Sequence, residues 1–447
     1  MSDTDKKKIS ELPEKRLKKD KFEKRSKRNA LINVMEYLQQ RYDFRYNLFA
    51  AKPEYRLKQK KNEPPRAFVF FDERAFDNMI MDVKIDAGIE VTKDDFRSLI
   101  GSEQISEDYD PIKQYLFKLP PWDGEDRFRD LLQRVLLKGE DIRKHFIKSF
   151  TKWFVGMVAS IIDEKAYNEN CLVLCGSQGI GKTRFLVSLV PEELRLHYTF
   201  TGNYRPHDKD HLEMLGTKLL ILMDEMATLT RTDIETIKTT MSIRYITLRR
   251  AYGRAPIHLY RKASFCGAIN DEEFLTDQTG NRRWLPFAVE MIDLSDDYDV
   301  GPLYAQAVEM YRQGFRTYFD LEEIQKLEKF NEAFRRIPME EELIMKNYLP
   351  ATKQEIESGD SNIRFLTPSD IIHDLASKEE YKKMNVNDTS LKRLNNALKQ
   401  LKFIRIMKRI EEYPNPRRVY AIKRITSIEK EAFEIDGERK SQNDILF

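Results

Sequence analysis

The segment Gly176–Thr183 follows the spacing G-x-x-x-x-G-K-T, which brings residue types suited to binding phosphate close together. Glycines let backbone N–H groups turn inward around an anion, Lys182 supplies positive charge for the β- and γ-phosphate oxygens, and the Thr183 hydroxyl completes a magnesium shell. A helix predicted to start at Thr183 would direct its positive end at the same anion. The sequence therefore predicts a phosphate loop for ATP and Mg²⁺. Its expected contacts are Gly176, Gln178, Gly179, Gly181, Lys182 and Thr183.

Two adjacent acids, Asp224 and Glu225, follow the apolar run 219–223. At the tip of a strand, Asp224 is suited to hold Mg²⁺ and Glu225 to polarise an attacking water. An acidic pair after an apolar strand is weak evidence alone, because strand ends often carry solvated charges. Its position after the Lys182 motif makes the pair meaningful, and the order Asp-Glu favours a hydrolase over a kinase for small metabolites.

After the apolar runs 171–175 and 219–223, a third run, 264–269, ends at Asn270, and Arg282 and Arg283 follow a turn. An amide at Asn270 could orient water beside the γ-phosphate, and either arginine could reach the γ-phosphate of a neighbouring subunit as an arginine finger. The alternatives are a turn residue at Asn270 and a pair of surface arginines. The predicted catalytic residues are Glu225, Asn270, Arg283 and Arg282.

The residues from Thr236 to Asn270 contain no aspartate or glutamate. Two alternating segments, 245–250 and 257–262, predict a hairpin whose tip holds Tyr252 and Arg254. Its basic residues are Lys238, Arg244, Arg249, Arg250, Arg254, Arg261 and Lys262. An aromatic side chain among cations is suited to base stacking and phosphate contact, so we expect DNA binding rather than ordinary solvation. The residues predicted to contact DNA here are Arg249, Arg250, Tyr252 and Arg254.

Short apolar runs separated by helical stretches predict an α/β core with buried parallel strands. The segment before it is mostly helical, with one helix expected over 128–137 and another pattern over 145–162. The first thirty residues carry 12 Lys and Arg against 6 Asp and Glu, which indicates a basic arm that is either solvated or bound to nucleic acid. The predicted divisions are an arm and leading helix at 1–43, a mostly helical domain at 44–165, an ATPase core at 166–295, a helical connector at 296–334 and a C-terminal domain at 335–447.

The C-terminal domain is predicted to be winged-helix-like. A helix begins within 365–372, a second helix capped by Asp388 buries one leucine face, and strands 403–410 and 418–422 form a wing. From Leu391 to Arg424 there are 11 Lys and Arg but only two acids. Duplex DNA binding is the favoured interpretation, and docking of protein is the alternative. The expected DNA contacts are Lys392, Arg393 and Arg417.

Composition narrows the class of protein. The 447 residues are 41% hydrophobic and 34% charged, with a formal net charge of +3 and three cysteines. These values exclude a polyelectrolyte and a disulfide scaffold, and no apolar run approaches the length of a membrane span. We expect a multidomain, cytoplasmic protein that does not associate with membranes.

Residues from about 105 to 290 resemble the virulence-associated protein E family of P-loop ATPases from phages and mobile elements. The matching segments are Leu119–Gly124, Gly176–Thr183, Lys209–Asp210, Met223–Glu225 and Thr279–Trp284. The order of motifs is also similar to superfamily-3 helicases, a hexameric AAA+ group that initiates viral and plasmid replication. The resemblance implies Asn270 as a sensor, Arg283 as the preferred finger and the hairpin 249–254 as a translocation element. Members often carry a primase domain upstream. No recognisable cluster of metal-binding acids precedes Tyr109, so we do not expect primase activity in this chain, although a separate partner could supply it.

Together these features predict a DNA-dependent ATPase, a ring-forming helicase or replication initiator that binds single-stranded or duplex DNA as a homo-oligomer. Two alternatives stay open. One is a DNA-binding protein whose assembly is switched by ATP without unwinding, and the other is an ATPase directed at protein in conflict between phage and host.

Overall fold

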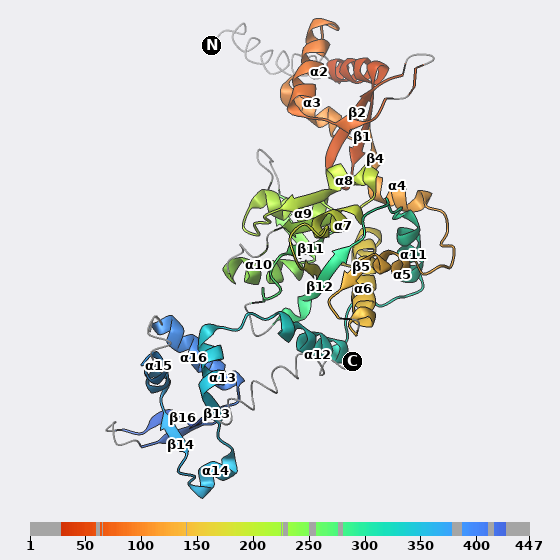
Figure 1. Cartoon of the computed structure of the whole chain (residues 1–447). Helices are drawn as coiled ribbons and strands as arrows, with labels where there is room; N and C mark the ends of the chain where they lie inside the picture. The colour runs from red at the N-terminus through yellow and green to blue at the C-terminus, as the bar shows by residue number, and fades with distance from the viewer. Residues whose placement is uncertain are drawn as a thin grey trace, which may run out of the picture. The chain divides into compact units, whose positions relative to one another are not determined.

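The computed structural model describes residues 28–59, 63–64, 66–139, 141–224, 226, 231–249, 256–275, 280–377, 387–409 and 415–425 (Figure 1). The chain divides into two compact units. Unit 1 comprises Met1–Lys138, Lys144–Glu272 and Arg282–Lys329, and unit 2 comprises Gly139–Arg143, Glu273–Asn281 and Phe330–Phe447. No helix among the described residues is long and apolar enough to cross a membrane.

Unit 1 begins with a small sheet flanked by helices. The strands are ordered β3-β2-β1-β4, and β1 pairs antiparallel with β2 but parallel with β4. After the helical residues 28–41, the elements are β1 (Tyr42–Asn47), β2 (Lys52–Leu57), β3 (Val69–Phe70), α2 (Glu73–Ile85), α3 (Lys93–Ile100) and β4 (Ser106–Tyr109). This sheet was not expected, because the sequence predicted a mostly helical domain at 44–165.

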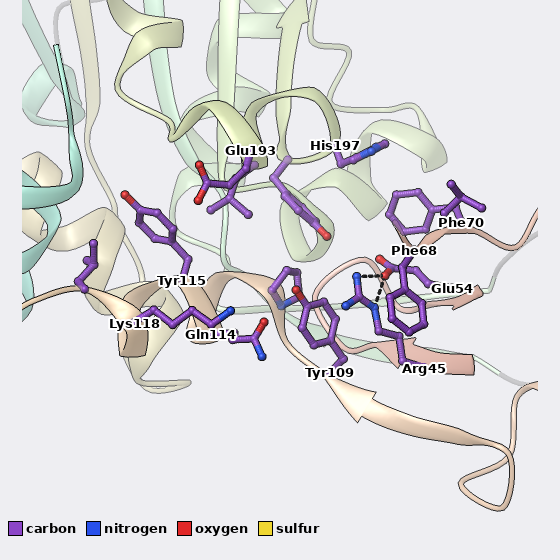
Figure 2. Close-up of a pocket in the computed structure, with 15 residues that line it drawn as sticks. Arg45, Glu54, Phe68, Phe70, Tyr109, Gln114, Tyr115, Lys118, Glu193 and His197 are labelled. Atoms are coloured by element: carbon purple, nitrogen blue, oxygen red, sulfur yellow. Dashed lines mark hydrogen bonds and ion pairs between the residues drawn. The ribbon is translucent and has the colours of Figure 1, made fainter. Parts of the chain in front are cut away.

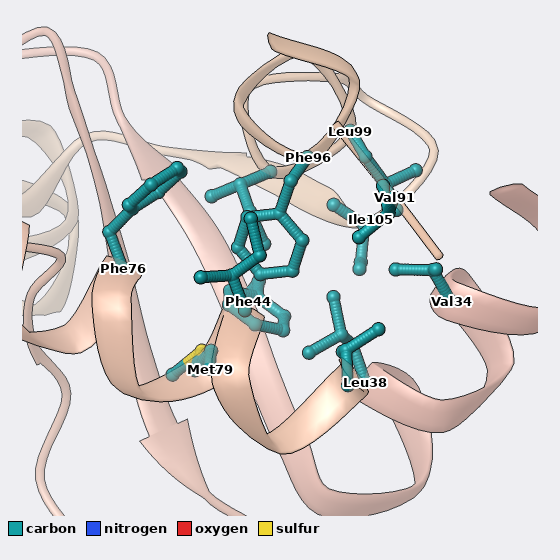
Figure 3. Close-up of a cluster of buried hydrophobic side chains, with 12 residues drawn as sticks. Val34, Leu38, Phe44, Phe76, Met79, Val91, Phe96, Leu99 and Ile105 are labelled. Carbon is teal, nitrogen blue, oxygen red and sulfur yellow. The ribbon is translucent and has the colours of Figure 1, made fainter. Parts of the chain in front are cut away.

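The core of this region is continuous from the leading helix to β4, as Figure 3 shows. Val34 and Leu38 on the leading helix pack with Phe44 of β1 and with apolar residues of α2 and α3. On α2, Phe76, Met79, Ile80 and Val83 are buried, at the spacing of one helix face. The leading helix and β1 thus share one core, although a boundary between them was predicted after residue 43. The predicted boundaries after residues 43, 165, 295 and 334 stay a prediction.

The central sheet of unit 1 has six strands among the described residues, in the order β5-β12-β6-β11-β8-β7. β12, β6, β11, β8 and β7 run parallel, and β5 is antiparallel to β12. Their bounds are β5 (Val135–Leu137), β6 (Cys171–Cys175), β7 (Thr199–Gly202), β8 (Leu220–Asp224), β11 (Ser264–Ile269) and β12 (Trp284–Ile292). Every residue of β6 and β11 is buried, as expected of central parallel strands. The mixed α/β fold with a parallel sheet is therefore confirmed.

Helices alternate with the strands in this part of the chain. They are α4 (Pro111–Lys118), α5 (Arg127–Gln133), α6 (Arg143–Ile162), α7 (Lys182–Ser188), α8 (Glu192–Tyr198), α9 (Lys209–Thr217), α10 (Arg231–Met241), α11 (Gly301–Arg312) and α12 (Leu321–Asn331). Almost the whole length of α6 is buried, and the Trp153 indole N–H donates to the carbonyl of Phe265 in β11 (2.9 Å). The helix predicted over 128–137 is wrong at its end. It stops at Gln133, and β5 follows because Val135–Leu137 pairs with β12.

Unit 2 contains helices around a small antiparallel sheet in which β16 pairs with β13, β14 and β15. Its elements are α13 (Met339–Asn347), β13 (Tyr348–Pro350), α14 (Lys353–Ser358), β14 (Ile363–Leu366), α15 (Pro368–Ala376), α16 (Asp388–Gln400), β15 (Arg405–Lys408) and β16 (Arg417–Arg424). Leu394 and Leu398 of α16 are buried against α13 and α15, as predicted. The cap of α16 is Asn387 rather than Asp388, because the Asn387 side chain accepts from the N–H groups of Thr389 and Ser390.

Candidate functional site

The loop 176–181 joins β6 to α7 at the carboxyl edge of the central sheet. Gly176 and Gly181 have φ angles of 152° and 91°, which other residues rarely adopt. A Cβ atom at Gly176 would lie 2.2 Å from the carbonyl oxygen of Val289, and one at Gly181 would lie 2.6 Å from the Leu294 side chain. Glycine is therefore required at both positions, where the loop turns closely past β12 and the residues after it.

The ammonium group of Lys182 lies inside this loop. Its Nζ donates to the carbonyl oxygens of Gly176 (2.7 Å) and Ser177 (2.8 Å) and to Oδ1 of Asn270 (3.1 Å). Burial lowers the pKa of Lys182, and the nearby charge of Asp224 opposes this effect. Three oxygen atoms thus hold a buried cation beside a surface that includes the exposed Ser177 and Asn270.

The carboxyl ends of three neighbouring strands meet at this edge. In the register of the sheet, Ile269 of β11 lies opposite Cys175 of β6, and Ala268 of β11 lies opposite Asp224 of β8. Because adjacent strands are about 4.8 Å apart, β8 lies roughly 10 Å from β6. The predicted strand-end residues Asp224 and Asn270 therefore lie on the same edge as the loop that holds Lys182.

The other residues predicted to bind nucleotide and metal are less constrained. Gln178 and Gly179 are exposed in the loop, and Thr183 is the half-buried second residue of α7, which begins one residue before the predicted start. Glu225 lies outside the described residues. In the described part of the chain, no group of three or more His, Cys, Asp or Glu side chains is arranged to hold a metal ion.

The two predicted finger arginines lie at the opposite edge of the sheet. They precede β12, whose first residue, Trp284, lies opposite Cys171, the first residue of β6. The length of β6 is about 13 Å at the usual rise per residue, so neither arginine is close to Lys182 of its own chain. The guanidinium of Arg283 donates from Nε (3.1 Å) and Nη2 (2.7 Å) to Oγ of Ser242. Arg282 is exposed.

The predicted hairpin is formed by β9 (Tyr245–Leu248) and β10 (Ile257–Tyr260), which pair antiparallel. Both strands pack against α9. Arg249 is exposed directly after β9. The tip residues Arg250, Tyr252 and Arg254 lie outside the described residues, so their predicted DNA contacts stay a prediction.

The uniform basic character of this segment is partly structural, which corrects the sequence interpretation. Arg261 is only 1% exposed, and its guanidinium donates to the carbonyl oxygens of Asn168, Thr240, Met241 and Ala263. Burial lowers the pKa of Arg261 to about 10.

Two further cations of this segment are also engaged in the fold. Lys238 is buried. Lys262 Nζ reaches the carbonyl oxygen of Leu48 (3.4 Å) and lies 4.4 Å from the centre of the Phe49 ring. With Arg261 and Lys238 buried and Lys262 half-buried, three of the seven basic residues pack within unit 1.

In unit 2, Lys392 and Arg393 are exposed on α16, and Arg417 is exposed at the start of β16. Arg393 Nη1 lies 3.9 Å from a carboxylate oxygen of the buried Glu340, a long contact. Arg417 lies opposite Lys408 in the β15–β16 pair. The predicted DNA contacts of these three residues stay a prediction.

A cavity of about 560 Å³ lies between the small sheet and α8, and none of the predicted site residues lines it (Figure 2). Arg45 lies 4.0 Å from the centre of the Phe68 ring and 3.6 Å from that of Tyr109, and it pairs with Glu54 (2.5 Å). The cavity is at the amino edge of the central sheet, because α8 leads directly into β7. Because successive side chains of a strand point to opposite faces, a strand at β1 predicts that Arg45 and Phe44 lie on opposite faces of the small sheet. No sequence pattern indicates the side chains that α4 and α8 contribute.

Comparison with known families identifies the class of the central segment. Residues 116–336 match the model of the virulence-associated protein E-like domain. The chain therefore carries a virulence-associated protein E-like domain, and the resemblance inferred from the sequence is confirmed. The match extends beyond the expected end near residue 290 to include α11 and α12.

Among solved structures, two apo structures of the C-terminal region of NrS-1 align with this chain at 12% identity and a TM-score of 0.43. Each alignment covers 89% of this chain and 99% or 100% of the other. A third apo structure of that region aligns at 12% identity and a TM-score of 0.41, over 88% of this chain and 99% of the other. No curated protein matches the chain.

Proposed function

We propose that this protein is a DNA-dependent ATPase and acts as a ring-forming, superfamily-3-like helicase or replication initiator of a phage or mobile element. One observation carries the proposal: the Lys182 ammonium is held by oxygens of its own loop and of Asn270, at the sheet edge that Asp224 also occupies. The virulence-associated protein E-like domain supports a role in replication of such an element.

The residues at this edge fit ATP with Mg²⁺. The turn at Gly176 and Gly181 leaves no room for side chains, so the backbone can approach phosphate closely. Lys182 would exchange its carbonyl partners for phosphate oxygens, which are stronger acceptors because they are charged. The Thr183 hydroxyl and the Asp224 carboxylate are hard oxygen ligands of the kind Mg²⁺ prefers. Bound ATP and Mg²⁺ would supply the γ-phosphoryl group and the positive charge that stabilises its transfer.

The remaining catalytic roles follow from position and residue type. Asn270 already contacts the Lys182 ammonium and would orient water beside the γ-phosphate. Glu225, next to Asp224, would polarise that water. Since Arg282 and Arg283 lie at the other edge of the sheet, either could act only on nucleotide bound by a neighbouring subunit. This arrangement supports a ring, and a hexamer is the proposed assembly.

DNA contact is proposed for two surfaces, each argued within its own unit. In unit 1 the contact is the β9–β10 hairpin with Arg249 and the tip residues. In unit 2, the order β14, α15, α16, β15, β16, with β16 between β14 and β15, supports a winged helix. Lys392, Arg393 and Arg417 would contact phosphates there. A separate partner would supply any primase activity.

The decisive experiment is steady-state ATP hydrolysis at low salt, with and without single-stranded DNA, because phosphate contacts weaken steeply as salt rises. Lys182→Ala serves as the blank, and Lys144→Ala, an exposed lysine on α6, is the matched control. We expect hydrolysis that DNA stimulates, lost in Lys182→Ala and retained in Lys144→Ala. Hydrolysis by Lys182→Ala at the normal rate would overturn the nucleotide site. A rate of hydrolysis that is the same with and without DNA would contradict the proposed DNA-dependent ATPase and favour the protein-directed ATPase.

A further inference from the structure

The strands of the hairpin present two tyrosines side by side on their exposed face. Tyr245 of β9 lies directly opposite Tyr260 of β10, and the two side chains are 63% and 45% exposed. The next pair on the same face is Thr247 and His258, whose side chains are 2.7 Å apart at Oγ1 and Nδ1. We call these four exposed residues the tyrosine face.

The opposite face of the hairpin is apolar, so the orientation of the tyrosine face is fixed. Ile246 is buried, and Leu248, Ile257 and Leu259 are partly buried, in the alternation expected when one side of a ribbon packs on a helix. That helix is α9. A slip of one residue would expose these four apolar side chains, and burying them therefore keeps both tyrosines outward.

The register also brings the tyrosines close together. The Arg261 N–H donates to the Arg244 carbonyl (2.9 Å), so these two residues form a hydrogen-bonded pair. Such pairs alternate with non-hydrogen-bonded pairs, and Tyr245–Tyr260 is the next pair along. The Cα atoms of a non-hydrogen-bonded pair are about 4.5 Å apart, closer than those of the other kind. The two phenol rings therefore leave the backbone from neighbouring points.

The charge around the tyrosine face selects its ligand. The segment 236–270 has no acidic residue, and the exposed Arg244 and Arg249 lie at the two ends of β9. Exposed aromatic rings can stack with flat, unpaired bases, and neighbouring cations can bind phosphates. Single-stranded nucleic acid offers both groups. In a duplex the bases stack on one another and their faces are not accessible, so a stacking surface favours single strands.

We propose that Tyr245 and Tyr260 form a base-stacking platform for single-stranded DNA at the base of the hairpin. This rests on the proposed function of the hairpin as a DNA contact, and it moves base recognition from the tip residue Tyr252 to the strands. Arg244 and Arg249 would hold the phosphates on either side of the stacked bases.

The test compares two double variants in binding of fluorescein-labelled oligothymidylate, measured by anisotropy at low salt. Tyr245→Leu with Tyr260→Leu keeps apolar bulk but removes the flat rings, whereas Tyr245→Phe with Tyr260→Phe keeps the rings. In the leucine variant we expect the affinity for oligothymidylate to fall about tenfold if one base stacks on the platform, and about a hundredfold if two bases do. The phenylalanine variant should stay within about threefold of the wild type. Tyr318→Leu, which alters an exposed tyrosine elsewhere in unit 1, is the control.

An abasic oligonucleotide of equal length separates stacking from phosphate contact. It should bind wild type and leucine variant equally, because it carries the charge but no rings. Equal binding of oligothymidylate by wild type and leucine variant would overturn the platform while leaving the proposed function intact. Failure of the wild type to bind any single strand would instead overturn the proposed DNA contact. A changed elution volume of the leucine variant would identify the face as a subunit interface and overturn the platform.

Discussion

Lys182, in the loop after β6, and Arg261, at the base of the β9–β10 hairpin, are both buried cations whose hydrogen bonds go to neutral oxygen atoms. The difference is in the surroundings of those oxygens. Of the three residues that bind Lys182, Gly176 is buried but Ser177 and Asn270 are exposed, whereas the four residues that bind Arg261 are all buried. A cation with surface partners can exchange them for a ligand. A cation with buried partners can only hold the fold together.

Arg261 connects three segments of unit 1. Its acceptors are at the end of α10, in the connection between α6 and β6, and in the residue pair that leads into β11. The hairpin is therefore fixed at its base to the same sheet that carries the Lys182 loop. Burial lowers the pKa of both cations, but only Arg261 is shielded on every side by protein.

The largest expected effect comes from replacing Arg261. Arg261→Met removes the donor that satisfies four buried carbonyl groups, so we expect the free energy of unfolding of unit 1 to fall by about 3–5 kcal/mol. Lys182→Met should change it by less, about 1 kcal/mol, since two of its three partners, Ser177 and Asn270, are exposed and can turn to water. Urea unfolding followed by tryptophan fluorescence measures this directly, because all three tryptophans belong to unit 1.

Equal losses in the two variants would break the distinction between a structural and an exchangeable cation. A loss of DNA binding by Arg261→Met with unchanged stability would also contradict it, because Arg261 would then have to be accessible. Lys144→Met, at an exposed lysine on α6, gives the baseline for a substitution without buried partners.

A third buried cation has a carboxylate partner, which predicts an acid dependence of stability that the neutral partners of Lys182 and Arg261 do not give. Lys152 Nζ donates to the carbonyls of Arg316 (3.2 Å) and Tyr318 (2.6 Å) and to Glu323 (3.3 Å). Burial would raise the pKa of Glu323, but hydrogen bonds from Lys148 and Lys152 lower it to about 2.

Because the folded pKa of Glu323 lies below its ordinary value of 4.5, this carboxylate stabilises the fold above pH 4.5 and loses that contribution as pH falls toward 2. Between pH 5 and pH 3 the loss should be roughly 2 kcal/mol. Glu323→Gln should be less stable at pH 7 and should lack this part of the acid dependence. Urea midpoints at pH 5, 4 and 3 for both proteins provide the measurement. Parallel curves would show that the carboxylate is not coupled to folding.

The sequence was sufficient where a local pattern determines the outcome. Apolar runs predicted β6, β8 and β11, and alternation predicted the pairing of β9 with β10. Because the glycine and lysine spacing describes one short loop, it also located Lys182 without knowledge of the rest of the fold. The family resemblance was carried by such local motifs and was confirmed.

Sequence patterns could not predict what distant segments determine. Val135–Leu137 read as the end of a helix, but pairing with β12 makes it a strand. Arg261 was grouped with the hairpin cations because the sequence gives its charge but not its surroundings. Its hydrogen bonds to the carbonyls of Asn168 and Thr240 depend on segments that are distant in the chain. The cavity beside Arg45 was missed for the same reason, since its walls come from segments more than a hundred residues apart.

The smallest expected effect concerns Arg283, which has a single hydroxyl partner. Ser242→Ala removes that acceptor, but the half-buried guanidinium can turn to water, so we expect a loss of only about 1 kcal/mol. Ser102→Ala is the matched control, because its hydroxyl donates to a backbone carbonyl and binds no cation. A loss as large as that of Arg261→Met would mean that Arg283 is fixed to its own chain.

If the loss is small, Arg283 is available to a neighbouring subunit, and a mixture of Lys182→Ala and Arg283→Ala proteins should recover hydrolysis that neither has alone. If Arg283→Ala is fully active and the mixture recovers no hydrolysis, the exposed Arg282 would be the arginine finger instead.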